Sequence, residues 1–253
     1  MKRNMMLYLF TVLVFSVFVS SSVRGDLPNG LVFLMTFDEG LGDIAHDQSG
    51  YGNDGTIDGK EGWEDGIFGK AFNFDGATYI TVPNAEPLSE LTHPMSVGLW
   101  INPAAVGGWR SILEMDGAAG WKIGLNNGTD AVVWTTYTVK DFAAATPIAT
   151  DEWTHIAAVW DGSEALIYVN GELDATVAGG GVIDVSNEPS LDFGYRSTTA
   201  ASWYEGAVDD AFIFNRLIDQ SEIKTYMDGF ANLLAVEPGG KIATAWGELK
   251  TPR

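Results

Sequence analysis

Two apolar runs joined by an Asp-Gly pair, and followed by an Asn-Gly pair, constrain the fold of this chain more than any other feature. Residues 153–160 (Trp-Thr-His-Ile-Ala-Ala-Val-Trp) and 165–169 (Ala-Leu-Ile-Tyr-Val) are rich in β-branched and aromatic residues, which is typical of strands. Asp161-Gly162 separates the two runs and Asn170-Gly171 ends the second. Asn-Gly and Asp-Gly readily adopt the positive φ of tight hairpin turns. The stretch therefore predicts three consecutive antiparallel strands.

Segments of strand length recur at a spacing of roughly ten residues, which favours an antiparallel sandwich or barrel over alternating βα units. They are residues 31–37, 71–75, 79–82, 95–101, 109–115, 121–125, 131–137 and 206–216. One helix is predicted near the end, because Asp219 can cap it, Glu222 can reach back to the cap, and Gly229 can stop it. The sequence thus predicts an all-β fold with one short C-terminal helix.

These motifs resemble the laminin-G-like (LamG) domains of the concanavalin A-like lectin/glucanase superfamily. In those domains a Trp-x-His-hydrophobic-Ala strand, an Asp-Gly turn and a Tyr-Val-Asn-Gly hairpin occur in this order. The last strand (206–216) and the Glu222-Ile223 pair of the following helix also match. The resemblance covers about Leu31 to Asp228 and implies a two-sheet antiparallel jelly-roll sandwich.

The N-terminus has the charged, apolar and small-residue regions of a secretory signal, with Lys2 and Arg3 before the apolar run 5–19. We expect a signal peptide at 1–25, a LamG-like domain at 26–230 and an extension at 231–253. An uncleaved membrane anchor is the alternative, although about 15 apolar residues are fewer than the ~20 of a spanning helix. The extension is compatible with an added edge strand, a segment folded back on the sandwich, or a connection to another protein.

The composition limits the classes of molecule that this chain is expected to bind. The formal charge of −20 repels nucleic-acid phosphates and anionic lipid and favours cations. The chain has no cysteine, which rules out disulfides and thiolate metal sites. We therefore expect a secreted or extracytoplasmic protein that binds no nucleic acid and meets a membrane only through an uncleaved signal segment. The oligomeric state stays open.

Glycoside hydrolases of the superfamily carry Glu-x-Asp-x-x-Glu on one strand, and hydrolysis needs two facing carboxylates. The nearest match here is Glu172-Leu173-Asp174, with Val177 where the second glutamate belongs. His155 lies within a strand pattern, which indicates a structural histidine. We expect no enzyme, with an unusual glycoside hydrolase as the least favoured alternative.

Calcium is the metal that this sequence favours, because Asp, Asn and backbone carbonyls on irregular loops supply its oxygen ligands. Residues 38–40 and 46–55 concentrate such oxygens. The resemblance implies a structural calcium near the N-terminal loops and an acidic position of the last strand. On this basis the expected ligands are Asp38, Asp47, Asn53 and Asp209, although ordinary turn chemistry explains the same residues.

Aromatic faces that stack on sugar rings are the remaining candidates for a binding site. Trp109 follows Gly107-Gly108, and Trp134 is followed by Thr135-Thr136-Tyr137. The predicted ligand-binding residues are Trp109, Trp134 and Tyr137. The predicted function is non-catalytic binding of a glycan or glycoprotein, supported by structural calcium. A structural or protein–protein adhesion domain is the alternative.

Overall fold

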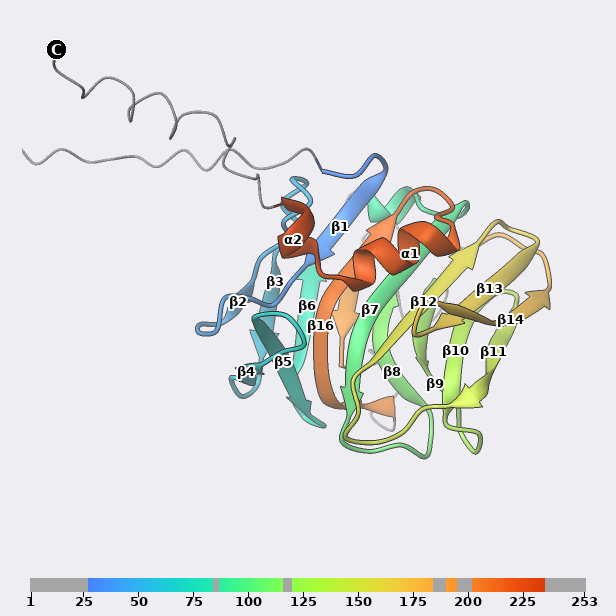
Figure 1. Cartoon of the computed structure of the whole chain (residues 1–253). Coiled ribbons are helices and arrows are strands. Elements are labelled where there is room, and N and C mark those ends of the chain that lie inside the picture. The colour runs from blue at the N-terminus through green and yellow to red at the C-terminus, as the bar shows by residue number, and fades with distance from the viewer. Residues whose placement is uncertain (1–26, 84–86, 116–119, 184–189, 195–201, 235–253) are drawn as a thin grey trace, which may run out of the picture. The chain divides into compact units, whose positions relative to one another are not determined.

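The computed structural model describes residues 27–83, 87–115, 120–183, 190–194 and 202–234. The predicted signal peptide and the part of the predicted extension beyond residue 234 lie outside these ranges. Two antiparallel sheets make up the described fold (Figure 1). The prediction of an all-β jelly-roll sandwich is confirmed.

Sheet A is built around β7 and β16. Its strands, in spatial order, are β14 (Glu172–Ala178), β13 (Glu164–Val169), β12 (Thr154–Trp160), β7 (Met95–Pro103), β16 (Glu205–Phe214), β5 (Lys70–Asp75) and β4 (Trp63–Asp65), and β1 (Leu31–Met35) also pairs with β16. The predicted meander forms β12, β13 and β14, with Asn170 at φ 50° and Gly171 at φ 73° in the second turn.

Sheet B lies across the core from sheet A. Its strands, in spatial order, are β11 (Lys140–Pro147), β10 (Ala131–Thr136), β9 (Trp121–Leu125), β8 (Arg110–Met115), β15 (Ser190–Phe193), β6 (Tyr79–Pro83), β3 (Gly55–Asp58) and β2 (Ile44–Ala45). A short 3₁₀ turn, η1 (Leu88–Glu90), precedes β7. Aromatic side chains such as Trp121, Trp160 and Phe193 fill the space between the sheets and have no exposed surface.

The predicted helix is α1 (Gln220–Met227), and its capping box is formed by Asp219 and Glu222. A second short helix, α2 (Phe230–Leu234), follows it, so the first residues of the predicted extension are helical. Both helices lie on the outer face of sheet A (Figure 1). There Ile223, Tyr226 and Phe230 pack with Phe212 and Phe214 in a second apolar cluster.

Candidate functional site

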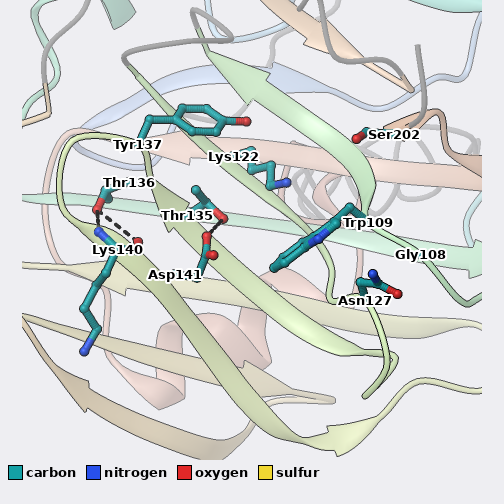
Figure 2. Close-up of a pocket in the computed structure, with 10 residues that line it drawn as sticks. All are labelled: Gly108, Trp109, Lys122, Asn127, Thr135, Thr136, Tyr137, Lys140, Asp141 and Ser202. Carbon is teal, nitrogen blue, oxygen red and sulfur yellow. Dashed lines mark hydrogen bonds between the residues drawn. The ribbon is translucent and has the colours of Figure 1, made fainter. Parts of the chain in front are cut away.

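A pocket of about 570 Å³ lies on the outer face of sheet B (Figure 2). The lining residues come from the loop before β8, from β9, β10 and β11, from the turns that join these three strands, and from the segment before β16. They are Gly108, Trp109, Lys122, Asn127, Thr135, Thr136, Tyr137, Lys140, Asp141 and Ser202. The pocket thus joins one predicted aromatic residue before β8 to another after β10.

Trp109 and Tyr137 stand at opposite ends of this pocket, with Lys122 between them (Figure 2). Both aromatic residues are half-buried, so each ring retains an accessible part. The Lys122 ammonium lies 4.9 Å from the centroid of the Trp109 ring, within the range of a cation–π contact. The Tyr137 hydroxyl lies 3.1 Å from Oε2 of Glu114. Each ring is therefore oriented by a charged neighbour.

Two local features fix the loop that carries Trp109. Gly107 and Gly108 have φ values of 87° and 81°, which residues with a Cβ rarely adopt. Arg110, the next residue, donates from Nη1 to the Trp203 carbonyl over 2.9 Å and lies 3.5 Å from the Glu205 carboxylate. The glycines let the chain turn, and Arg110 holds it to the segment before β16.

The floor of the pocket is formed by part of a row of polar residues that runs across the strands of sheet B. In the strand register Thr135 lies opposite Lys122 and Asp141, and Lys122 lies opposite Glu114. The row continues to Asp192, which lies opposite Glu114. Because alternate residues of a strand face opposite sides, this row points outward while neighbours such as Ile123 and Trp134 enter the core.

Hydrogen bonds hold the carboxylates of this row. The Thr135 hydroxyl donates to Asp141 over 2.6 Å, and the Ser111 hydroxyl donates to Glu114 over 2.6 Å. The hydroxyls of Thr81 and Ser190 donate to Asp192 over 2.7 Å each. Burial nevertheless raises the pKa of Asp192 above its usual value. The floor thus presents ordered donors and acceptors, which is what recognition of hydroxyl groups requires.

Trp134 has a different place from the one that the sequence suggested. Its side chain is fully buried, and its ring stacks on Trp121 with centroids 5.0 Å apart in the core. An inward-facing ring cannot offer a surface to a ligand. Trp134 is a core residue, which corrects its assignment to the ligand surface, and its neighbour Thr135 reaches the pocket instead.

Asp47 and Asn53, two of the predicted calcium ligands, lie in one loop, which the Asp47 carboxylate organises. The Asp47 carboxylate accepts from the backbone N–H of Leu34, Ser49 and Asn53 and from the Ser49 hydroxyl, over 2.8 to 3.1 Å. Each oxygen therefore has two donors. These hydrogen bonds close the loop around the Asp47 carboxylate, and its role as a calcium ligand stays a prediction.

Asp38 and Asp209 are the other two predicted ligands, and the charge of Asp38 acts on the Asp209 carboxylate. Asp209 is fully buried, and its Oδ2 accepts from the Phe68 N–H over 3.1 Å. Its Oδ1 has no hydrogen-bond partner among the described residues. Burial is the main cause that raises the pKa of Asp209 to about 8, and the charges of Asp210 and Asp38 add to it. An unpaired buried carboxylate oxygen beside other carboxylates is compatible with a cation.

Within the described ranges, no group of three or more His, Cys, Asp or Glu side chains is arranged to hold a metal ion. A calcium ion at Asp38 and Asp209 would therefore need backbone carbonyls or water as its further ligands.

The acidic pair considered for catalysis has structural partners. Glu172 lies 2.6 Å from Lys224 and 2.9 Å from the Gln220 amide, which links β14 to α1. Asp174 accepts from the backbone N–H groups of Ala145 and Thr146 and joins the edges of the two sheets. These contacts explain both acidic residues without a reaction.

The family model Laminin_G_3, described as the concanavalin A-like lectin/glucanases superfamily, matches residues 74–224. The chain belongs to this family. The match begins in β5 and ends in α1, so it includes every strand that contributes to the pocket. No curated protein sequence matches the chain significantly.

Solved structures share the fold of this superfamily member at low identity. The fourth domain of AbnA, an extracellular GH43 arabinanase from Geobacillus stearothermophilus solved with arabinotriose, is 20% identical with a TM-score of 0.63, and the match covers 77% of this chain and 97% of that domain. The binding domain of botulinum neurotoxin DC, solved with rat synaptotagmin II, is 16% identical with a TM-score of 0.59 and coverages of 79% and 51%.

The binding domain of Paraclostridial Mosquitocidal Protein 1 is 20% identical with a TM-score of 0.61, and the match covers 80% of this chain and 53% of that one. The chain thus spans about half the length of the toxin binding domains. At these identities the likeness establishes the fold.

Among the described residues, no helix has the length and apolar character needed to cross a membrane.

Sequence reasoning missed Lys122, Thr135 and Asp141 as pocket residues. Lys122 stands between Trp121 and Ile123 in a strand, and Thr135 directly follows Trp134, so alternation could have identified both as outward-facing. Their meeting with Asp141 depends on the register of three strands, which single-strand patterns do not contain.

Proposed function

We propose that this chain is a non-catalytic carbohydrate-recognition module that binds a glycan between Trp109 and Tyr137. The observation that carries the proposal is a preformed pocket with an aromatic ring at each end and the ordered polar floor of Lys122, Thr135 and Asp141 between them. Sugar rings present an apolar face and a rim of hydroxyls, so this arrangement matches both. The arabinotriose complex of the AbnA domain supports the class of ligand.

A glycan array on residues 26–253 tests the proposal. We expect specific binding that Trp109→Ala weakens about five- to tenfold, because the substitution removes a stacking face worth about 1–1.4 kcal/mol. Tyr51→Ala is the matched control, since it removes an aromatic side chain that is 55% exposed in the 47–53 loop. A blank array, or equal losses in both variants, would contradict the proposal.

The alternative is a protein–protein adhesion domain. The complex of the neurotoxin binding domain with rat synaptotagmin II shows that a related fold is compatible with a protein ligand. Pull-down of a protein partner that deglycosylation leaves intact would favour this alternative. Release of reducing sugar from a panel of polysaccharides would instead favour the glycoside hydrolase.

We also propose a structural calcium at Asp38 and Asp209. The unpaired Oδ1 of Asp209 and the nearby charge of Asp38 support it. The ion would supply positive charge to the buried Asp209 carboxylate and so stabilise the segment after β1 and the middle of β16.

Thermal unfolding of chelator-treated protein measures this effect. Millimolar calcium should raise the melting temperature, because a ligand that binds only the folded state stabilises it by mass action. Asp209→Asn should reduce the rise, while Asp54→Asn, in a neighbouring acidic loop, should preserve it. If millimolar calcium leaves the melting temperature of the unmodified protein unchanged, the proposed calcium site is wrong.

Export is the last part of the proposal. The charged and apolar pattern of residues 1–25 supports a secretory signal. Fractionation of producing cells and N-terminal sequencing of the protein are the direct tests. Recovery of the intact N-terminus in the membrane fraction would favour the uncleaved anchor.

A further inference from the structure

A second pocket, of about 530 Å³, lies on the outer face of sheet A. Trp100 of β7 forms its floor, since the residues on either side of it, Leu99 and Ile101, point into the core. Ile67 and Phe68 come from the β4–β5 loop, Asn170 from the β13–β14 turn, and Lys224, Met227 and Asp228 from the end of α1. This pocket shares no residue with the pocket on sheet B.

Contacts on three sides hold the walls in place. The Phe68 N–H donates to Asp209 over 3.1 Å, and the Phe68 ring meets Trp100 edge-on with centroids 6.4 Å apart. A Cβ added at Gly229 would lie 3.0 Å from the Phe68 ring, and one added at Gly171 would lie 2.8 Å from the Met227 sulfur. Such close backbone approaches leave little room for the walls to collapse, so the pocket is preformed.

The polar groups at the floor and rim are the Trp100 indole, the Asn170 amide, the Lys224 ammonium and the Asp228 carboxylate. Trp100 Nε1 is buried and has no hydrogen-bond partner among the described residues. Asn170 Oδ1 accepts from the His155 N–H over 3.0 Å, which leaves the amide NH₂ of Asn170 to serve as a donor. Lys224 stands at the rim, where Glu172 holds its ammonium at 2.6 Å.

We propose that this second pocket binds a small aromatic molecule that carries a hydrogen-bond acceptor such as a carboxylate or carbonyl. The rings of Phe68 and Trp100 and the thioether of Met227 provide apolar and sulfur–aromatic contacts for a planar ring. The Asn170 amide, at an exposed position on the rim, donates to the acceptor of the ligand. The volume lies within the range of sites for small molecules.

Titration of the full chain with 4-hydroxycinnamate, followed by calorimetry and ligand-observed NMR, tests this inference. We expect one saturable site per chain. Asn170→Asp should weaken binding about tenfold or more, because it replaces the amide donor by a carboxylate while it retains the oxygen that accepts from His155. Asn127→Asp makes the same chemical change in the pocket on sheet B and should leave the affinity unchanged.

Ile67→Trp is the second variant. Ile67 is 36% exposed, so a larger side chain there fills the pocket without removing a core contact. We expect this variant to abolish binding at an unchanged melting temperature. The proposal is overturned if the unmodified chain binds no 4-hydroxycinnamate at millimolar concentration. It is equally overturned if Ile67→Trp binds normally, or if Asn127→Asp weakens binding as much as Asn170→Asp does.

Discussion

At the scale of single residues, His155 shows how burial determines chemistry. The side chain is fully buried, and neither ring nitrogen has a hydrogen-bond partner among the described residues. Its ring stacks on Phe212 with centroids 6.0 Å apart and meets Trp100 edge-on at 5.4 Å. Burial lowers the pKa of His155 to about 3. A histidine in this state is neutral throughout the physiological range and serves packing, as the sequence pattern indicated.

His155→Phe should therefore reduce the sensitivity of the fold to acid. Between pH 6.5 and about 3 the unfolded chain binds a proton at residue 155 that the folded protein does not, so the free energy of unfolding falls as the pH is lowered through this window. Each pH unit costs up to about 1.4 kcal/mol. Urea unfolding at pH 7 and pH 4.5 should show a smaller loss in His155→Phe. His46→Phe, at an exposed position, is the control, and equal losses in both variants would contradict the prediction.

At the scale of elements, β16 carries both core side chains and two buried aspartates, Asp209 and Asp210. It pairs with β5 through Glu205–Val208 and with β1 through Ala211–Phe214. Asp209 and Asp210 occupy the change of partner, where the register shifts and Asp210 has a φ of 44°. The irregular backbone releases these two residues from the β5 and β1 ladders. Their carboxylates then bind the N–H groups of Phe68 and Phe230.

The two aspartates give β16 a pH dependence that is opposite to that of His155. Burial raises the pKa of Asp209 to about 8 and that of Asp210 to about 7, from an ordinary value of 3.8. In chelator, the folded protein holds protons that the unfolded chain has released, so stability falls as pH rises from about 4 to the folded-state pKa values of about 7 and 8 and levels off above them. Asp209→Asn should flatten this decline in unfolding experiments from about pH 5 to 8, and Asp58→Asn, at an exposed position, should preserve it. An undiminished slope in Asp209→Asn would refute this assignment.

At the scale of the molecule, two apolar clusters share the strands of sheet A. The main cluster fills the sandwich, and the second lies between sheet A and the two helices. Phe230 belongs to the second cluster, with its ring 5.1 Å from Tyr226 and 5.2 Å from Phe212. The end of the described chain therefore completes the cover of sheet A.

Phe230→Ala should lower the free energy of unfolding by about 3–5 kcal/mol, because a fully buried ring leaves a cavity when it is removed. The backbone N–H that donates to Asp210 is retained in this variant. Leu233→Ala, at a side chain that is 37% exposed, should cost less than about 1 kcal/mol. Denaturant unfolding measures both values. Similar losses would mean that α2 does not contribute to this cluster.

The sequence by itself determined the class of fold, the meander, the capped helix and the family, because each depends on patterns within one segment. Apolar runs of strand length specify strands, Asn-Gly specifies its turn, and Asp219 with Glu222 specifies a helix start. Trp109 and Tyr137 were also accessible to sequence reasoning, since each borders a turn that carries it toward the surface.

Only the tertiary structure decided which side chains meet. Trp134 and Thr135 are adjacent in the sequence, yet Trp134 lies in the core and Thr135 lines the pocket. Successive strand residues point to opposite faces of the sheet, and the face that carries the apolar side chains is the one that is buried. The same is true of Asp47, whose carboxylate is filled by donors from its own loop and from Leu34 of β1. Trp100, Asn170 and Met227 form one pocket because α1 packs back over sheet A. Such contacts join segments that are far apart in the sequence, so the pattern within any one segment cannot predict them.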